Sequence, residues 1–301
     1  MEVRGFCYFI AVLLLCASCG TPKQRVLQGA HAPLLRVDTV KINPDSVNLP
    51  SVTESLTEKL VLALPVAVTT EDKMAMLMRE GIHKNADWSE AAHYDIRKPN
   101  FVIIHHTAQR SIQQTIRTFQ LEHTKVSAHY VIGKDGRVVQ MLNDYLRAWH
   151  AGRSKWGNIN DINSISLGIE LDNNGREAFP EAQINALLTL LDTLKTKYSI
   201  PFTNFLGHAD IAPARKNDPS VFFPWKQLAD RGFGVWYDES NLIPPPSNFN
   251  YVDALRIIGY DVSNIDAAII AFKRKFIVTD VSKELTDYDR RVLYNLYRRY
   301  F

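Results

Sequence analysis

Cysteine is almost absent from this chain of 301 residues. Its three cysteines, Cys7, Cys16 and Cys19, all lie close to the amino terminus, and none lies in the remainder of the chain. The absence excludes a disulfide framework, a cysteine nucleophile and a thiolate zinc site from the body of the protein. A metal bound by the body must therefore be held by histidine and carboxylate side chains.

The chain also lacks an excess of charge of one sign. Lys and Arg number 35 and Asp and Glu number 32, which gives a formal net charge of +3. This balance gives no indication that nucleic acid is a partner, and we expect none. Hydrophobic residues make up 46% of the sequence, which is enough for a folded core, and the length suits two domains in what we expect to be a monomer.

The apolar run over residues 6–17 is too short to span a membrane, because a spanning helix needs roughly 18 or more such residues. A run of this length is typical of a signal-peptide core. It ends in Cys16-Ala17-Ser18-Cys19, which resembles a bacterial lipoprotein signal, in which the cysteine is lipidated and becomes the first residue of the mature protein. We expect a signal peptide over residues 1–18 and a lipid anchor at Cys19, which holds the protein in the bacterial cell envelope, on the periplasmic face of the outer membrane. The alternatives are an ordinary signal peptide and a short anchor helix.

Strand and helix patterns alternate from residue 100 onward. A buried strand is predicted over residues 101–104, paired strands over 127–132 and 137–142, and a further strand over 164–172. Helices are predicted over residues 111–122 and from Pro180 to near Pro201, followed by a short strand at 204–206. This alternation predicts an α/β fold with a central sheet.

The strand predicted over residues 164–172 alternates cleanly between two faces. Ser166, Gly168 and Glu170 share one face, and four aliphatic residues share the other. Glu170 therefore rises from a floor of small residues, and we expect this floor to leave room for something to lie on it.

Histidines follow two of the predicted strands. His105 and His106 end the first strand and His208 follows the short one, with Asp210 and Asp218 nearby. Strand ends are where α/β folds assemble their sites, and two histidines with one carboxylate are a known catalytic zinc arrangement. Spacing alone does not choose between the two neighbouring histidines or between the two aspartates.

Five separated motifs supply that choice by resemblance. In chain order they are Val102-Ile-Ile-His105-His-Thr107, Ser127-Ala-His-Tyr130, Trp149-His-Ala-Gly152, Gly168-Ile-Glu170, and the segment 207–219 that begins Gly-His-Ala-Asp and ends Arg-Lys-Asn-Asp-Pro. Together they resemble the zinc-dependent N-acetylmuramoyl-L-alanine amidases of the type 2 family, which are related to the peptidoglycan recognition proteins. The resemblance spans residues 98–236 and implies a central mixed sheet flanked by helices.

The resemblance also implies roles for individual residues. The zinc ligands of the family fall on His105, His208 and Asp218, its acid/base glutamate on Glu170, and its transition-state lysine on Lys216. Zinc lowers the pKa of its bound water and polarises the scissile carbonyl, Glu170 moves the proton, and Lys216 faces the developing oxyanion. The implied reaction is hydrolysis of the amide between the lactyl group of N-acetylmuramic acid and L-alanine, in peptidoglycan or in muropeptides.

Two neighbouring residues are expected to have other roles. His106 should point to the opposite face of its strand from His105 and should be structural. Asp210 is expected to support the ligands or to cap a helix rather than to bind the metal. The residues expected to contact substrate lie in the matched motifs and on the polar loop 149–163; they are His129, Trp149, His150, Trp156, Asn163 and Arg215. The alternative for the two tryptophans is that they simply pack the loop.

A proline-rich linker, Ile243-Pro-Pro-Pro-Ser247, predicts a domain boundary. Beyond it lie three short helical patterns that resemble the small peptidoglycan-binding domains often joined to such amidases, and a module of this size is expected to dock on the larger domain. The expected organisation is a signal peptide at 1–18, a tether and extension at 19–70, the amidase domain with its lead-in at 71–242, and an all-α three-helix module at 243–301.

The complete set of implied ligands together with Glu170 favours an enzyme. The rival hypothesis is a lipoprotein that recognises peptidoglycan without cutting it, since relatives of this fold bind wall fragments in that way. Loss of a zinc ligand would have favoured this rival.

Overall fold

A computed structural model of the chain describes residues 98–300, all of which lie in one compact unit. The predicted signal peptide, the lipidation site at Cys19, the tether and most of the lead-in fall outside the described residues. Within the described part of the chain, no helix combines the length and the apolar character needed to cross a membrane.

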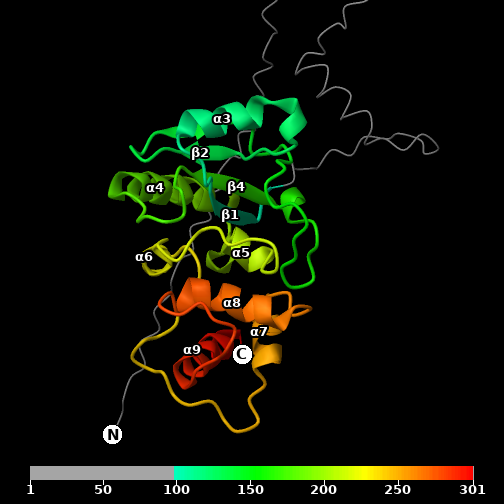
Figure 1. Cartoon of the computed structure of the whole chain (residues 1–301), viewed down its shortest axis with the longest axis vertical. Coiled ribbons are helices and arrows are strands. Elements are labelled where there is room, and N and C mark those ends of the chain that lie inside the picture. The colour runs from blue at the N-terminus through cyan, green and yellow to red at the C-terminus, as the bar shows by residue number, and fades with distance from the viewer. Residues whose placement is uncertain (1–97, 301) are drawn as a thin grey trace, which may run out of the picture. The chain divides into compact units, whose positions relative to one another are not determined.

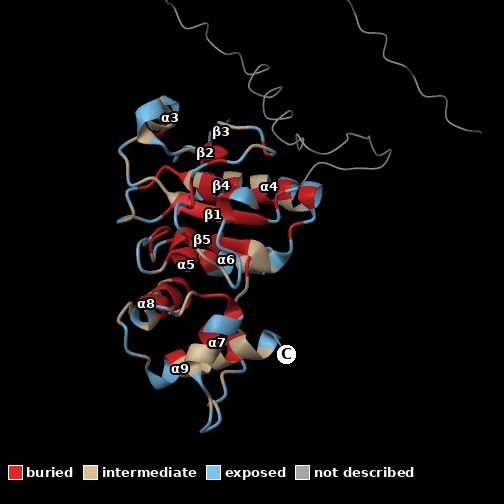
Figure 2. Ribbon diagram, turned by 90° about the vertical axis from the view of Figure 1, so that its right-hand side faces the viewer, coloured by how far each residue is buried: buried red, intermediate tan, exposed pale blue. Residues whose placement is uncertain are grey.

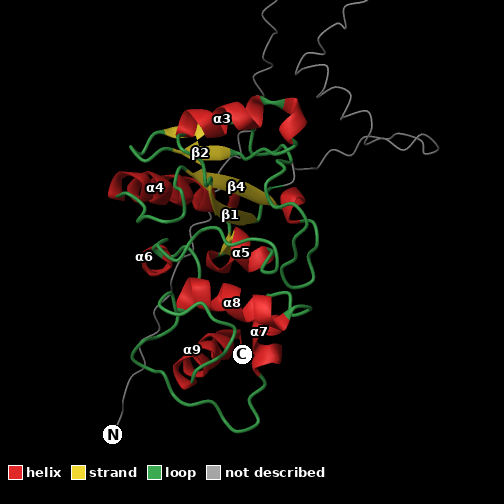
Figure 3. Cartoon of the chain, in the orientation of Figure 1, coloured by secondary structure: helices red, strands yellow, loops and turns green. Residues whose placement is uncertain are grey.

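The core of the fold is a five-stranded mixed sheet (Figures 1 and 3). The strands follow the order β3-β2-β4-β1-β5; β3 is antiparallel to β2, and the other neighbouring pairs are parallel. Their bounds are β1 Phe101–His106, β2 Tyr130–Ile132, β3 Val138–Gln140, β4 Ser166–Leu171 and β5 Phe205–Gly207. The predicted central mixed sheet and each of its predicted strands are therefore confirmed.

Strands β1 and β4 lie at the centre of the sheet, where both faces are covered (Figure 2). The run Val102-Ile103-Ile104 suits this position because it is apolar on both faces of the strand, and all three residues are fully buried. Val102 and Ile104 belong to one core cluster, and Ile103 belongs to another on the opposite face. His105 continues the second face, which is the face that carries the site.

Helices cover the sheet. The predicted helix after Pro180 is α4 (Glu181–Tyr198), and its stripe of leucines is buried against the first core cluster. The predicted helix at residues 111–122 is α3 (Ile112–Gln120), where the Ser111 hydroxyl accepts a hydrogen bond from the backbone of Gln114. Two short helices, α5 (His208–Ile211) and α6 (Trp225–Asp230), follow β5, and 3-10 turns occupy Glu122–Thr124, Ile162–Ser164, Phe202–Asn204 and Arg298–Tyr300.

The last three helices are α7 (Tyr251–Ile258), α8 (Ile265–Phe276) and α9 (Asp287–Tyr297), as the sequence predicts. They share a hydrophobic cluster of their own, and α8 packs against α5 (Figure 1). The expectation that this C-terminal module docks on the larger domain is confirmed. The exact domain boundaries stay a prediction.

Candidate metal centre

The site lies where three neighbouring parallel strands end. The register pairs His105 of β1 with Glu170 of β4, and it pairs Ile104 with Gly207 of β5. His208 follows Gly207 directly and begins α5. Because the carboxyl ends of parallel strands meet at one edge of a sheet, three residues far apart in sequence come together there.

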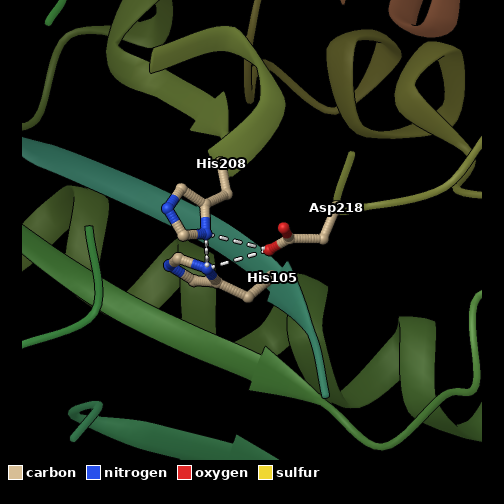
Figure 4. A group of neighbouring side chains, drawn as sticks. All are labelled: His105, His208 and Asp218. Carbon is tan, nitrogen blue, oxygen red and sulfur yellow. Dashed lines mark hydrogen bonds and ion pairs between the residues drawn. The ribbon is translucent and has the colours of Figure 1, made fainter. Parts of the chain in front are cut away.

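Two histidines and one aspartate converge on a single point (Figure 4). The Nδ1 atoms of His105 and His208 lie 2.9 Å apart, and each lies 3.1 Å from Oδ2 of Asp218. All three residues are buried. In a tetrahedral site with zinc–ligand distances near 2.0–2.1 Å, ligand atoms are separated by about 3.3 Å, so this triangle fits a zinc ion with only a slight expansion.

Backbone contact sets the tautomer of His208. Its Nε2 lies 3.0 Å from the carbonyl oxygen of Ala151, which can only accept a hydrogen bond. Nε2 therefore carries the proton, and Nδ1 presents its lone pair to the centre. A histidine that donates its second nitrogen in this way is typical of metal ligands.

A longer chain of hydrogen bonds sets the tautomer of His105. The carbonyl oxygen of Ile162 can only accept a hydrogen bond, so the Ser166 hydroxyl donates one to it at a distance of 2.6 Å. The same hydroxyl then accepts from Nε2 of His150 at 3.2 Å, and Nδ1 of His150 accepts from Nε2 of His105 at 3.1 Å. Every link runs in one direction, which leaves Nδ1 of His105 unprotonated and free to bind a cation.

Burial supports this assignment. It lowers the pKa of His105 to about 4, and the neighbouring His208 acts in the same direction. Burial also holds the pKa of His150 well below its ordinary value. The imidazoles of His105 and His150 are therefore neutral near pH 7, and for His105 the neutral form is the one that binds a metal.

Glu170 stands beside the triangle without a partner. Its Oε2 atom is buried and has no hydrogen bond within the described part of the chain. Burial raises the pKa of Glu170 to about 8, the charge of Asp218 adds to this effect, and Lys216 opposes it. A carboxylate of this kind exchanges a proton near neutral pH, as a general acid/base must.

A cavity of about 390 Å³ opens over these groups. It brings together seven of the residues predicted from the sequence: Trp149, His150, Glu170, His208, Arg215, Lys216 and Asp218. Helix α3 supplies part of the wall through Thr115, Thr118 and Phe119.

Comparison with known proteins agrees with this geometry. Residues 95–221 match the family described as N-acetylmuramoyl-L-alanine amidase. The chain is 35% identical to N-acetylmuramoyl-L-alanine amidase AmiD of Escherichia coli over 54% of this chain and 66% of that protein. It is 32% identical to 1,6-anhydro-N-acetylmuramyl-L-alanine amidase AmpD of Citrobacter freundii over 51% of this chain and 93% of that protein. The chain belongs to the N-acetylmuramoyl-L-alanine amidase family.

The fold agrees over a greater length. The solved structure of Escherichia coli AmiD, in complex with the substrate anhydro-N-acetylmuramic acid-L-Ala-D-gamma-Glu-L-Lys, matches 73% of this chain and 96% of its own, with a TM-score of 0.61 and 30% identity. This amidase is therefore a hydrolase with the mixed-sheet fold of its family.

The floor of small residues on β4 is filled by the protein itself. A Cβ atom at Gly168 would lie 2.4 Å from the His150 ring, so only glycine lets that ring lie on the strand. Ser166 on the same face bonds the ring. The small residues therefore do leave room above the strand, and the group that occupies it is the His150 ring from a distant loop, which the sequence pattern did not identify. His150 is buried and supports His105, and its predicted substrate contact stays a prediction.

Three other predicted substrate-binding residues of this amidase are not among those that line the cavity. His129 is fully buried, with its ring between the backbone amide of Gly168 and the carbonyl of Leu146. Asn163 is buried and accepts hydrogen bonds from the backbone of His150 and of Ala151, so it shapes the loop.

Trp156 packs on the C-terminal module. Its ring lies 5.1 Å from that of Tyr260, measured between centroids. Of the two tryptophans on the loop, only Trp149, which is 51% exposed, lines the cavity.

The structure gives Asp210 a role outside the metal centre, as expected. Its carboxylate accepts from the backbone N–H of Gly207 at 2.8 Å, from the Tyr260 hydroxyl at 2.8 Å and from the Lys275 ammonium at 2.8 Å. Sequence reasoning did not identify Lys275 as its partner. The available signal was a lysine on the buried stripe of α8, three residues after Phe272.

His106 lies on the opposite face of β1 from His105, as predicted. Its Nδ1 accepts a hydrogen bond from the backbone N–H of Ser220 at 3.2 Å. This contact holds the segment after Asp218 close to β1.

Proposed function

We propose that this protein is a zinc amidase that hydrolyses the bond between the lactyl group of N-acetylmuramic acid and L-alanine in anhydro-muropeptides, working in the cell envelope as a lipoprotein. The observation that carries the proposal is the buried triangle of His105, His208 and Asp218 beside an unpartnered Glu170 in one cavity. The AmiD complex with an anhydro-muropeptide supports the substrate class.

The two Nδ1 atoms and the Asp218 carboxylate would hold the zinc ion. Zinc bound there supplies Lewis acidity and lowers the pKa of a water molecule. The chain contributes the orientation of its ligands: Ala151 fixes the His208 ring, and His150 with Ser166 fixes the His105 ring.

Glu170 moves the proton. Its carboxylate accepts a proton from the water that attacks the carbonyl carbon, and it then delivers that proton to the nitrogen of the departing L-alanine as the carbon–nitrogen bond breaks. The products are a muramyl carboxylate and a free amine. Its raised pKa suits both halves of this exchange.

Lys216 and Arg215 line the cavity on the side of the segment 212–218. Lys216 supplies positive charge for the oxygen that becomes negative in the tetrahedral transition state. Arg215 donates hydrogen bonds to the carbonyls of Ala151 and Arg153, each at 2.8 Å. It therefore stabilises the loop that carries the Ala151 carbonyl, the acceptor for His208. Trp149 offers an exposed aromatic face at the rim, which suits a sugar ring.

The test of the activity is release of the stem peptide from an anhydro-muropeptide, with products identified by mass spectrometry and zinc quantified in the same samples. Wild type is expected to release a peptide that begins with L-alanine. Zinc-loaded wild type that binds several muropeptides and cleaves none would instead support the recognition lipoprotein.

Envelope attachment rests on the sequence around Cys19. Cys19→Ala is expected to block lipidation and processing, and Cys16→Ala serves as the matched control that leaves both intact. The measurement is the mass of the mature amino-terminal peptide. A mature chain that starts elsewhere and carries no acyl group contradicts the anchor.

A further inference from the structure

A second cavity lies next to the active-site cavity and has a volume of about 380 Å³. We call it the Arg274 cavity; its wall includes His106, Arg176, Ser220 and Arg274. It shares three lining residues with the active-site cavity, namely His106, Ala108 and Asn217. The two hollows therefore adjoin each other along one stretch of wall.

The C-terminal module supplies one arginine of this wall. Helix α8 is fastened to α5 by the buried ion pair between Lys275 and Asp210, at 2.8 Å, and the Lys275 ammonium also lies 4.0 Å from the centroid of the Trp225 ring. Arg274 is the residue just before Lys275, so the same anchor fixes its position next to the segment after Asp218. The anchor therefore holds the backbone of Arg274 against the larger domain, and its side chain lines the cavity.

Neither arginine of the wall is neutralised by a close partner. Among the described residues, no hydrogen bond or ion pair joins the guanidinium of Arg274 or of Arg176 to another side chain. The carboxylates that act on the charge of Arg274 are Asp210 and Asp218. Both are already engaged, Asp210 by Lys275 and Tyr260, and Asp218 in the metal triangle.

A buried hydroxyl adds to the polar wall. Ser220 lines the Arg274 cavity, and its Oγ atom is buried without a hydrogen-bond partner in the described chain. The backbone of the same residue is held by His106. A buried polar atom without a partner is costly, so this hydroxyl suits a polar group that enters the cavity.

The loop that carries Gly175 and Arg176 also lines the cavity. Gly175 has φ of +78°, and a Cβ atom there would lie 2.7 Å from the His106 ring, so the loop approaches β1 closely only because this residue is glycine. Backbone N–H groups of Gly175 and Arg176 are held by the side chains of Asn173 and Asn174, at 2.7 and 2.8 Å. This ordered loop presents Arg176 to the cavity.

Two guanidinium groups without close partners and a buried hydroxyl line this one cavity, and groups of these kinds donate hydrogen bonds to carboxylates. The peptide in the AmiD complex supplies such groups, because a γ-linked glutamate keeps its α-carboxylate and a terminal lysine keeps its own. We propose that Arg274 and Arg176 bind a carboxylate of the stem peptide beyond L-alanine, so that the C-terminal module takes part directly in substrate selection. This inference rests on the proposed function.

The experiment measures binding of the tripeptide L-Ala-D-γ-Glu-L-Lys to the zinc-loaded full chain by calorimetry. Arg274→Gln and Arg176→Gln are each expected to weaken binding about tenfold, because each removes a charge-assisted hydrogen bond. The matched controls are Arg137→Gln and Arg256→Gln, two exposed arginines that line neither cavity. These controls are expected to bind as wild type does.

A second arm does not depend on the folding of a variant. Amidation of the two free carboxylates of the tripeptide is expected to weaken its binding to wild type and to remove the difference between wild type and Arg274→Gln. Equal affinity of the free and amidated peptides for wild type overturns the inference, and so does the absence of binding by wild type or an unchanged affinity in Arg274→Gln.

Kinetics complete the test. With an anhydro-muropeptide that carries the full tripeptide, Arg274→Gln is expected to raise KM and to leave kcat nearly unchanged, whereas with a substrate that ends at L-alanine the two enzymes should be equal. Arginine-dependent peptide binding without any cleavage overturns the proposed function and leaves this inference standing. Cleavage that does not depend on Arg274 or on whether the peptide carboxylates are amidated supports the proposed function and overturns this inference.

Discussion

Two buried polar clusters lie on either side of helix α5. The metal-site cluster consists of His105, His208 and Asp218, and the Asp210 cluster consists of Asp210, Tyr260 and Lys275. Each contains one aspartate, and all six residues are buried. The clusters differ in where the positive charge comes from.

The Asp210 cluster supplies its own cation. The Lys275 ammonium, the Tyr260 hydroxyl and the Gly207 N–H together occupy the carboxylate of Asp210, so the cluster is complete within the protein. Burial raises the pKa of Tyr260 well above its ordinary value, which keeps this residue a neutral donor. A buried carboxylate that the chain itself neutralises joins parts of the fold, here the larger domain and the C-terminal module.

The metal-site cluster supplies only lone pairs. Hydrogen-bond acceptors beside the Nε2 atoms of His105 and His208 keep the proton on Nε2. The two Nδ1 atoms and a carboxylate oxygen of Asp218 are therefore free of protons and point at one position. The role of a buried aspartate therefore follows from its partners. An aspartate whose hydrogen-bond donors all come from the chain connects two parts of the fold. An aspartate that lies among other unprotonated acceptor atoms indicates a site for an external cation.

The largest expected effect separates the two aspartates. Asp218→Ala is expected to abolish both zinc binding and activity, because two remaining ligands hold the ion poorly. Asp210→Ala is expected to keep zinc in whatever fraction of the protein folds. Zinc content per folded chain, measured on both variants after gel filtration, checks this; loss of zinc from Asp210→Ala with retention in Asp218→Ala would reverse the assignment.

The next effect concerns the proton carrier beside the triangle. Glu170→Gln keeps the size of the side chain but removes the base, so kcat is expected to fall by about 10²–10⁴-fold while zinc stays bound. Steady-state turnover of an anhydro-muropeptide, with zinc quantified in parallel, measures this. Equal turnover by wild type and variant would remove Glu170 from the mechanism.

The free energy of unfolding should depend more on the Asp210 cluster than on the metal-site cluster. Asp210→Ala leaves the Lys275 ammonium buried without a carboxylate, and breaking a buried pair of this kind costs about 3–5 kcal/mol of unfolding free energy. The double variant Asp210→Leu with Lys275→Met should lose less than either single variant, because no charge is stranded. Denaturant unfolding of wild type, Asp210→Leu, Lys275→Met and the double variant gives the coupling, and strictly additive losses would show that the two side chains do not act as a pair.

The sequence predicted the metal-site cluster better than the Asp210 cluster, for a physical reason. Strand alternation and strand ends are local patterns, and they place His105, Glu170 and His208 on one edge of one sheet before any tertiary contact is known. Lys275 also occupies a local pattern, but its partner lies 65 residues away on another element. No periodicity connects two such segments.

Loop residues were predicted least well. The Trp149–Asn163 loop carries four expected substrate-binding residues, of which Trp149 and His150 reach the cavity. Trp156 instead meets the C-terminal module, and Asn163 turns inward to hold the loop backbone. An irregular segment has no period that shows which side faces the cavity, so only tertiary contacts decide it.

A smaller effect tests the chain of hydrogen bonds behind His105. Ser166→Ala removes the acceptor for Nε2 of His150, so the proton on that ring is no longer fixed and His105 loses part of its orientation. Zinc affinity is expected to fall about tenfold, as for other groups that support metal ligands. Competition with a chelator of known affinity measures it; the control is Ser164→Ala, a hydroxyl that bonds Arg147 and Asp161 away from the centre. An unchanged affinity in Ser166→Ala would contradict the proposed direction of the chain.

The smallest expected effect is a pH dependence of stability in the metal-free protein. The ordinary pKa of glutamate is 4.5, and burial raises the pKa of Glu170 to about 8 in the folded chain. Between these values the folded state holds a proton that the unfolded state has lost, so this carboxyl destabilises the fold progressively as pH rises, by at most about 1.4 kcal/mol per pH unit. His105 acts in the opposite direction below pH 6.5, because its lowered pKa makes the folded state bind fewer protons.

Glu170→Gln removes the contribution of Glu170 and keeps that of His105. The unfolding free energy of metal-free wild type, measured against this variant from about pH 5 to pH 8, should therefore decline relative to the variant as pH rises. Parallel curves would mean that Glu170 is already ionised in the folded protein, and it would then enter catalysis as a base that needs no prior loss of a proton.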